Sequence, residues 1–392
     1  MRKLTVRHKQ WLVRRARAGT WKRVSQKYTY QRTVTAWFGD RIESVLCVCE
    51  PRRPPAQICL QENPTETISF FDEWRSENAI KTSVANPSRY QWVAKPKKHG
   101  RLGKIRGYVD YSKIEYISTA SALVIAAEYD RARRLSGHVP PTINLHDWSE
   151  QVFAKLYELG FFEIVGLSRD LGHLYQDSED VRTMKIVCGR NAADLQRTSE
   201  SLIELSKYID LDGPLEDEVV LALNSALSEA MVNVARHAYP NDYDFHYRHV
   251  DSWWVTASAH RGKRRLTVVM YDQGASIPVT LPRKTWARSL QDFVVRNLTL
   301  HKEFEYQDDA TFIQGAMRRG ETQTGEPGRG EGLPQMMELI DICGSGSLTI
   351  WSRGGVCRYV PGNGVECSAQ RRSVGGTLIE WVIDLPRDER NE

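Results

Sequence analysis

The segment 214–242 constrains the fold of this chain most, because it is predicted to form one long helix with distinct faces. Proline and acids suit its first turn, and a proline followed by asparagine suits its end. At about 100° per residue, Asn233 and His237 lie within about 80° of Glu229 on the helix surface. The apolar positions gather on another face: Leu223, Leu227, Met231, Val234 and Ala238. Taken alone, the pattern also fits a plain amphipathic surface helix.

A second informative segment, 264–276, reads as a buried strand that ends in Asp272 and a glycine turn at Gly274. A carboxylate at such a position can accept a hydrogen bond from the amino group of adenine. Glycine lets the backbone lie close to a flat ring. The segment therefore predicts one wall of a purine site.

Two further segments complete a series of four. The first, 326–341, leads into an amphipathic helix and holds glycine at every second position: Gly328, Gly330 and Gly332. A glycine-rich turn before a helix directs unpaired N–H groups at phosphate oxygens. The second, 374–384, is an alternating strand that starts after Gly376 at Thr377. One glycine-rich turn is weak evidence, but four such elements in this order favour a nucleotide site.

The four segments resemble the motifs of the gyrase, heat-shock chaperone, histidine kinase and MutL (GHKL) ATPases. Glu-Ala-Met-Val-Asn-Val-Ala-Arg-His-Ala-Tyr at 229–239 is similar to their N-box, and most similar to that of anti-sigma-factor serine kinases. Asp-Gln-Gly-Ala-Ser at 272–276 resembles the G1 box, Gly-Arg-Gly-Glu-Gly-Leu at 328–333 the G2 box, and Gly-Gly-Thr at 375–377 the final motif. The resemblance covers about residues 200–388 and implies a mixed sheet backed by helices that binds ATP and Mg²⁺.

The resemblance also implies a role for each matched residue. Glu229 would be the general base, and Asn233 would supply an oxygen to Mg²⁺, which prefers hard oxygen ligands and bridges phosphates. Asp272 would hold the adenine. The other nucleotide-binding positions would be Gly274, Gly328, Arg329, Gly330, Gly332, Leu333 and Thr377.

The main departure from the family pattern is Ser276, which stands where a second glycine is usual in the G1 box. Ile277 and Pro278 follow it and stiffen the entrance to the next segment, a change that threatens turnover more than binding. Residues 285–325 contain a helix and then a Gly- and Thr-rich stretch. This stretch suits a lid that orders on nucleotide binding, and it equally suits an ordinary long loop.

The middle of the chain alternates strands and helices, which predicts a small α/β domain. Residues 107–133, with the strand and helix that follow, resemble STAS domains, the fold of anti-anti-sigma factors. Ser118–Ser121 matches the turn that is phosphorylated in those regulators, but Ala120 occupies the acceptor position, between Thr119 and Ser121. A phosphate there would add about −1.5 to −2 charge at a helix start. A structural or docking role for this turn is the favoured interpretation.

The first 40 residues are strongly basic, with eleven Lys or Arg residues and one acid in a chain of net charge +5. Such segregation suggests a polyanionic partner, although a solvated tail explains it as well. Residues 18–40 have a faint helix-turn-helix rhythm that includes Val34 and Trp37. We therefore weigh nucleic-acid binding through this segment against a basic extension that packs on the body or on a protein partner.

Metal and redox patterns are weak. Seven cysteines without framework spacing suit reduced thiols in a cytosol. Cys47, Cys49 and Cys59 have no nearby histidine, and His246 with His249 lies in what reads as a solvated loop, so we expect no metal site at either place. No signal peptide and no apolar run of about 20 residues is evident. We expect a cytoplasmic protein that does not associate with membranes.

Together these patterns predict an α/β (α+β) protein with a basic segment at 1–42, a STAS-like domain at 43–190 and a GHKL α/β sandwich at 191–392. The expected function is a Mg²⁺-dependent ATPase or serine/threonine kinase that acts on a protein partner in bacterial regulation. The alternative is an ATP-gated binding or homodimerisation module that contacts nucleic acid or protein. A scaffold with a degenerate site is a third hypothesis. A conventional sensor histidine kinase is not expected, because the helical stretch 191–210 contains no histidine.

Overall fold

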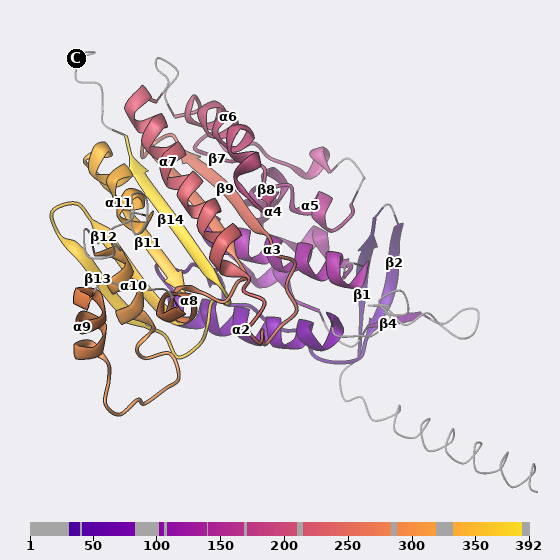
Figure 1. Cartoon of the computed structure of the whole chain (residues 1–392). Helices are drawn as coiled ribbons and strands as arrows, with labels where there is room; N and C mark the ends of the chain where they lie inside the picture. The colour runs from indigo at the N-terminus through magenta and orange to yellow at the C-terminus, as the bar shows by residue number, and fades with distance from the viewer. Residues whose placement is uncertain are drawn as a thin grey trace, which may run out of the picture.

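The structure is a computed structural model, and it describes residues 31–39, 41–82, 102–105, 108–138, 140–167, 171–209, 215–283, 288–318 and 332–385. These residues form an α/β fold, as the sequence predicted. Its centre is an eight-stranded sheet of order β13-β12-β11-β14-β10-β9-β7, with β8 also paired to β9 (Figure 1). The strands are β7 Val181–Thr183, β8 Val187–Gly189, β9 Trp253–His260, β10 Arg265–Asp272, β11 Gly346–Ser352, β12 Gly355–Val360, β13 Gly364–Ala369 and β14 Thr377–Asp384. Every pairing described in this sheet is antiparallel, so the mixed sheet expected for the C-terminal half is wrong in this respect.

Helices of the C-terminal half cover one face of this sheet. They are α6 Leu195–Ser206, α7 Asp217–Asn233, α10 Asp309–Met317 and α11 Gly332–Cys343, with the short α8 Ile277–Thr280 and the more peripheral α9 Arg288–Asn297. Alternate residues of β10 and β14, such as Val268 and Trp381, point into the core beneath α7 and α11. This period-two burial is what a sheet with one face against helices requires.

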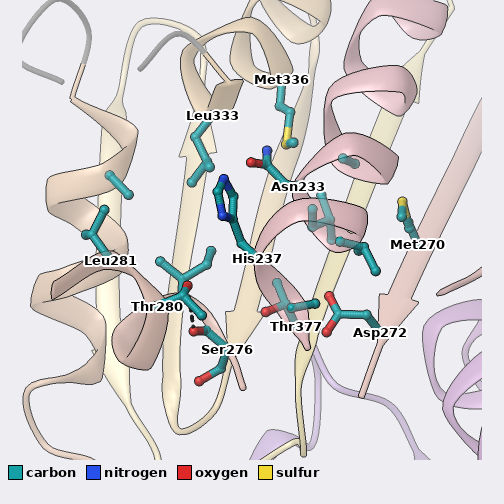
Figure 2. A pocket seen from close by; sticks show the side chains of 16 residues that line it. Asn233, His237, Met270, Asp272, Ser276, Thr280, Leu281, Leu333, Met336 and Thr377 are labelled. Carbon is teal, nitrogen blue, oxygen red and sulfur yellow. Dashed lines mark hydrogen bonds between the residues drawn. The ribbon is translucent and has the colours of Figure 1, made fainter. Parts of the chain in front are cut away.

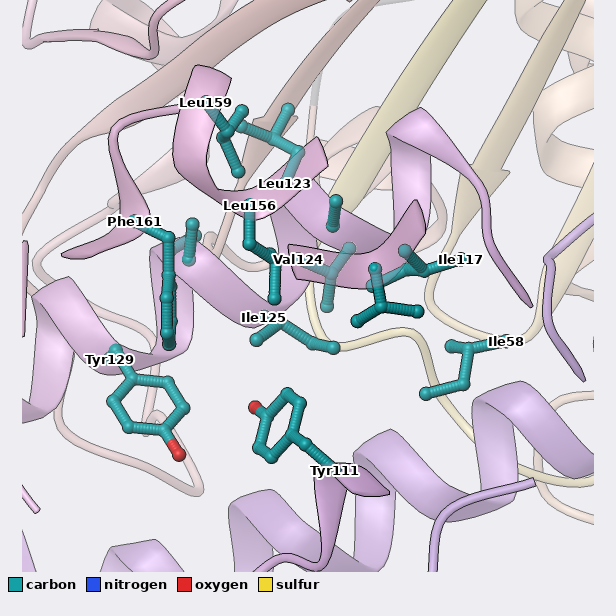
Figure 3. Close-up of a cluster of buried hydrophobic side chains, with 14 of the residues drawn as sticks. Ile58, Tyr111, Ile117, Leu123, Val124, Ile125, Tyr129, Leu156, Leu159 and Phe161 are labelled. Atoms are coloured by element: carbon teal, nitrogen blue, oxygen red, sulfur yellow. The ribbon is translucent and has the colours of Figure 1, made fainter. Parts of the chain in front are cut away.

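The opposite face of the same sheet is covered by helices from the N-terminal half. These are α2 Pro64–Thr82, α3 Thr119–Ser136, α4 Glu150–Glu158 and α5 Phe161–Ile164. Helix α3 is buried from Thr119 to Ala132, because the sheet lies on one side of it and the other helices on the other. Figure 3 shows part of this second core, to which Leu123, Ile125 and Phe161 belong. The molecule therefore has three layers, with the sheet in the middle.

Two small sheets complete the N-terminal half. One has the order β4-β2-β1-β6 and includes a parallel pair, β2 with β4. The other is the two-stranded parallel pair of β3 and β5. Their strands are β1 Arg32–Phe38, β2 Arg41–Cys47, β3 Gln57–Ile58, β4 Gly103–Ile105, β5 Tyr116–Ile117 and β6 Thr142–Ile143.

The sheets do not respect the predicted domain boundaries. Strand β1 belongs to the basic segment expected at 1–42, yet it pairs with β2 along its whole length. Strands β7 and β8 were assigned to the STAS-like domain, yet both pair with β9 of the C-terminal sheet. Strand pairing joins segments that are distant in sequence, so changes in composition along the chain do not show which strands pair.

The helix-turn-helix rhythm expected in 18–40 is wrong for its second part. Val34 and Trp37 lie on β1, where Val34 and Ala36 are buried on one face of the small sheet. In so short a segment, apolar residues at every second position, as in a strand, cannot be distinguished from apolar residues at every third or fourth position, as in a helix. The rest of the basic segment, 1–30, lies outside the described residues.

The helix that was expected to follow residues 107–133 and a strand is divided into α4 and α5. Gly160 separates them with φ of 81°, a left-handed conformation that glycine adopts without steric cost. Helix α2 contributes three buried aromatic residues to the same core as α4 and α5: Phe70, Phe71 and Trp74.

The cysteines differ from expectation at one place. Cys357 and Cys367 form a disulfide between the neighbouring strands β12 and β13, so the expectation that all thiols are reduced is wrong for this pair. The hairpin register places the two residues directly opposite each other, which the sequence spacing did not reveal. Within the described part of the chain, no group of His, Cys, Asp or Glu residues could hold a metal ion.

Among the helices of the described residues, one is long and apolar enough to cross a membrane by length and composition: Asp217–Ala238. This helix is α7 with its continuation. Its inner apolar face, which includes Leu227 and Met231, is fully buried against the sheet and α11, whereas Leu221 on the outer side is 72% exposed. That is the arrangement of a core helix in a layered fold.

Candidate functional site: a pocket between the sheet and helices α7 and α11

A pocket lies on the face of the eight-stranded sheet that the helices of the C-terminal half cover. It is enclosed by strands β10 and β14 and by helices α7, α8, α10 and α11. Its empty space, including the open mouth, is about 680 Å³. Apolar side chains, among them Met270 and Met336, form most of the wall, and the polar groups are few (Figure 2). Small-molecule sites commonly have this composition. The labelled polar groups of the lining are Asn233, His237, Asp272, Ser276, Thr280 and Thr377.

Helix α7 presents two of these polar groups. The predicted apolar face is confirmed, because all five of its residues are buried: Leu223, Leu227, Met231, Val234 and Ala238. Asn233 and His237 are half-buried and line the pocket. From Val234 to Ala238 the helix widens into a π-helical turn, a feature frequently found at functional sites. The constant rotation of 100° assumed from the sequence therefore does not hold in this last turn.

Glu229 and Asn233 form a directed pair one helical turn apart. The Asn233 Nδ2 donates a hydrogen bond to Glu229 Oε1 at 2.9 Å. Because an ionised carboxylate can only accept, the amide nitrogen must face it, and the Asn233 Oδ1 faces away from it. The pair thus fixes the orientation of an amide oxygen on a residue of the pocket wall.

Gly332, the first residue of α11, lies directly against Glu229. A Cβ atom at Gly332 would lie 2.2 Å from Glu229 Oε1 and 2.9 Å from its Cδ. Only glycine allows this approach without a shift of the carboxylate. The contact brings the third predicted motif beside the first, although Glu229 itself is not part of the pocket lining.

Asp272 ends β10 at the base of the pocket. Its side chain is 6% exposed, and its Oδ1 accepts a hydrogen bond from the Gly274 backbone N–H at 2.7 Å. Burial raises the pKa of Asp272 to about 7, and hydrogen bonds from the backbone of Gly274 and Thr377 oppose that rise. The group is therefore poised to change charge near neutral pH.

Gly274 was predicted to lie beside the adenine, but in the structure it lies against Ala238 at the end of the π-helical turn. A Cβ atom there would lie 2.5 Å from the Ala238 carbonyl oxygen. The Ala275 N–H donates to the same oxygen at 2.7 Å. Gly274 is thus required by the close approach of the π-helical turn to the end of β10, and it is not among the residues that line the pocket.

Thr377 stands beside Asp272 on the next strand, where the two residues are register partners. Its Oγ1 shares a hydrogen bond with the Ser352 Oγ at 2.8 Å. A Cβ atom on the preceding Gly376, which has φ of 128°, would lie 2.0 Å from the Asp272 carbonyl oxygen. The two glycine-containing turns, after β10 and before β14, therefore pack backbone to backbone at the pocket base.

Ser276 adopts φ of 79° and ψ of 159°, a region that is essentially restricted to glycine. Its Oγ is buried and, within the described part of the chain, has no hydrogen-bond partner. The Thr280 Oγ1 donates to the Ser276 carbonyl oxygen at 3.0 Å (Figure 2), and the Ile277 N–H donates to the Ser352 Oγ at 2.9 Å. The residue that departs from the family pattern thus has the backbone conformation of the missing glycine.

The pocket brings together some of the predicted residues and not others. Asn233, Asp272, Leu333 and Thr377 line it, and Gly332 lies beside Glu229. The predicted phosphate-contacting residues Gly328, Arg329 and Gly330 lie outside the described residues. Sequence reasoning did not assign His237, Met270, Thr280, Leu281 or Met336 to the site. Met270 was detectable, because it lies two residues before Asp272 on the same strand face.

The predicted STAS-like turn is buried in the middle of the molecule. Ser118 caps α3 by accepting a hydrogen bond from the Ser121 N–H at 3.2 Å. Thr119 Oγ1 shares a hydrogen bond with the Ser258 Oγ of β9 at 2.8 Å, and Thr119 is 5% exposed. Ser121 is fully buried, so a protein kinase cannot reach the hydroxyl groups of Thr119 and Ser121 in this arrangement, which favours a structural role for the turn.

The sequence was also compared with known proteins. No protein-family model matches it, and a search of curated proteins returned no match. The interpretation of the pocket therefore depends on its geometry and on the resemblance of the four motifs.

Proposed function

We propose that the pocket binds an adenine nucleotide together with Mg²⁺, as in the GHKL ATPases that the motifs resemble. One observation carries the proposal. Asn233, Asp272, Leu333 and Thr377 come from four separate segments of the chain, and all four line one cavity. The contact between Gly332 and Glu229 supports it further, because it joins the first and third motifs.

The base of the pocket suits a purine. Asp272 can accept a hydrogen bond from an exocyclic amino group through the oxygen that Gly274 does not occupy. Met270, Ile379 and Ala238 surround this carboxyl with apolar surface, which excludes water from a flat ring. An amino donor would favour the ionised carboxylate, so nucleotide binding and deprotonation of Asp272 should occur together.

The residues on α7 fit a cation carried by phosphates. The Asn233 Oδ1 would be the protein ligand of Mg²⁺, because its Nδ2 is engaged by Glu229. Mg²⁺ usually takes only one or two protein ligands when it binds with a nucleotide, so a cluster of acids is not required. When bound, the cation would neutralise charge on the phosphate oxygens. Glu229 would orient and deprotonate a water molecule or a hydroxyl group.

We propose that the activity is hydrolysis of ATP or phosphorylation of a serine or threonine on a protein partner, in the cytoplasm of a bacterium. The buried turn at Thr119 favours an acceptor outside this chain. The alternative is an ATP-gated binding or homodimerisation module. The basic segment 1–42, whose first 30 residues lie outside the described part, is the proposed contact for nucleic acid or for a protein.

Binding is tested by calorimetric titration of the purified full chain with a non-hydrolysable ATP analogue and Mg²⁺, and by denaturant unfolding with and without these ligands. Saturating nucleotide at 100 times its Kd should raise the free energy of unfolding by about 2.7 kcal/mol. Asp272→Ala should abolish the effect, whereas Asp384→Ala, which alters an acid at the far end of the same sheet, should not. If adenine, guanine and cytosine nucleotides bind equally or not at all, the proposal is rejected.

The fate of the phosphate separates the candidate activities. With γ-labelled ATP, label in solution indicates an ATPase, and label on an added protein partner indicates a kinase. Glu229→Ala should remove either activity while it leaves nucleotide affinity nearly unchanged. Binding without turnover in the wild-type chain would favour the ATP-gated module.

A further inference from the structure

Arg75 reaches from the N-terminal layer to the turn that precedes β14. It lies on α2 and is 4% exposed. Its Nη2 donates to the Val374 carbonyl oxygen at 2.9 Å and to the Tyr271 hydroxyl at 3.0 Å. Tyr271 in turn donates to the Gly375 carbonyl oxygen at 2.9 Å. The guanidinium group therefore holds the Val374 carbonyl directly and the Gly375 carbonyl through the Tyr271 hydroxyl.

The contact with this turn is tight. A Cβ atom at Gly375, which has φ of 80°, would lie 1.8 Å from Arg75 Nη1. The guanidinium thus packs directly on the Gly375 Cα. Gly376 follows, with its Cα against the Asp272 carbonyl oxygen, and then Thr377 lines the pocket. Only Gly376 separates the Arg75 contact at Gly375 from Thr377 of the pocket wall.

Glu128 of α3 forms an ion pair with Arg75 and is 1% exposed. Arg131 holds both its oxygens, at 2.6 Å and 2.9 Å, and Arg75 Nε lies 3.9 Å from Oε2. Burial alone would raise the pKa of Glu128, but the two arginines outweigh it and the pKa is lowered. The carboxylate is therefore ionised and fixed in place.

Glu128 also contacts the second turn of the pocket base. Gln273 Nε2 donates to Glu128 Oε2 at 3.4 Å, and Gln273 follows Asp272 directly. Both turns that carry the pocket carboxyl and hydroxyl groups, after β10 and before β14, are thus tied to one buried ionic cluster. That cluster, composed of Arg75, Glu128 and Arg131, belongs entirely to α2 and α3.

We propose that Arg75 is a positioning residue for the nucleotide site, so that the N-terminal layer sets the spacing between Asp272 and Thr377 and with it the affinity of the pocket. This inference rests on the proposed function. The N-terminal layer then contributes to nucleotide affinity. A partner that displaces α2 changes this affinity through the turn at Val374 and Gly375.

The test compares Arg75→Met with a matched control, Arg265→Met. Both changes remove an arginine bound beside β10 and β14, but Arg265 pairs with Asp384 at 2.6 Å and 3.1 Å, at the opposite end of these two strands from Asp272 and Thr377. Both variants should unfold more easily. Only Arg75→Met should weaken binding of the ATP analogue, by about tenfold, because a charge-assisted hydrogen bond to the turn is lost. Arg75→Lys should restore part of the affinity through one bond to Val374.

A readout without nucleotide separates this inference from the proposed function. Hydrogen exchange of the ligand-free chain should accelerate at residues 374–378 in Arg75→Met and stay at the wild-type rate there in Arg265→Met. If the wild-type chain binds no nucleotide, the proposed function fails, and exchange still decides whether Arg75 positions the turn. Equal acceleration in both variants, or unchanged affinity in Arg75→Met, overturns the inference. Should Arg75→Met not fold, Tyr271→Phe removes the bridging hydroxyl and must show the same two effects more weakly.

Discussion

Gly332 and Glu229 are in direct contact, with the backbone of one helix start against the carboxylate of another helix. A Cβ atom at residue 332 would lie 2.2 Å from Glu229 Oε1. The same oxygen accepts the hydrogen bond that orients Asn233. The geometry of α7 and α11 at the pocket therefore depends on the absence of one side chain.

Gly332→Ala should impair turnover far more than it impairs folding. The new methyl group displaces the flexible end of Glu229, so we expect a loss of about 1 kcal/mol in the free energy of unfolding. The displaced carboxylate loses its bond to Asn233, and ATP turnover should fall to the level of Glu229→Ala. Denaturant unfolding and a phosphate-release assay measure the two effects. Gly262→Ala, which meets its nearest atom at 3.3 Å, is the control and should change neither.

Ser276→Gly should stabilise the protein. The conformation at φ 79° and ψ 159° costs a serine about 1–3 kcal/mol, and glycine adopts it freely at an entropic cost of about 0.5–1 kcal/mol. A net gain of about 1 kcal/mol in the free energy of unfolding follows. Ser276→Ala keeps the strain and removes only the buried hydroxyl, so it separates the two contributions. Equal stabilities of the Gly and Ala variants would show that backbone strain is not the cause.

Nucleotide affinity should rise with pH through neutrality. The pKa of Asp272 is raised to about 7, so the carboxyl is largely protonated below that pH and accepts only a weaker, uncharged hydrogen bond from an amino group. Titration of the ATP analogue between pH 6 and pH 8 should show the increase, and Asp272→Asn should give weak, pH-independent binding. A flat profile in the wild-type chain would contradict the assignment.

The free energy of unfolding should decrease as pH rises toward neutrality, whereas nucleotide affinity should increase. Asp272 and Glu380 both have pKa values raised to about 7, chiefly by burial. Between about pH 4 and pH 7 the folded state holds protons that the unfolded state has released, so stability falls as pH rises through this window. Glu380→Gln should reduce this fall without changing the pH dependence of nucleotide affinity, because Glu380 lies on β14 and is not part of the pocket lining.

Thr119→Glu should strongly destabilise the protein. Thr119 is 5% exposed against β9, so a charged side chain there would be desolvated, and we expect a loss of more than about 2 kcal/mol. Thr65→Glu, at an exposed position in the first turn of α2, should be nearly neutral in denaturant unfolding. A stable Thr119→Glu variant would reopen the STAS-like turn as a phosphorylation switch.

The local elements of the site could be predicted from the sequence. The faces of α7 follow from apolar residues at helical spacing, and the same spacing separates Glu229 from Asn233. The ends of β10 at Asp272 and of β14 at Thr377 follow from apolar runs that meet glycine turns. These features depend on residues within one segment, where periodicity and steric preference act directly.

Only the tertiary structure decided how the layers fit together. Arg75 reads in the sequence as one more charged residue of a helix, and its contact with Gly375 joins positions 300 residues apart. Strands β1, β7 and β8 pair across the predicted domain boundaries, because the hydrogen-bonding edges available to them are set by the sheet as a whole. The disulfide of Cys357 with Cys367 depends on hairpin register, and the burial of α3 depends on which face of the sheet it covers. Local sequence specifies faces and ends of elements, whereas long-range packing specifies their partners.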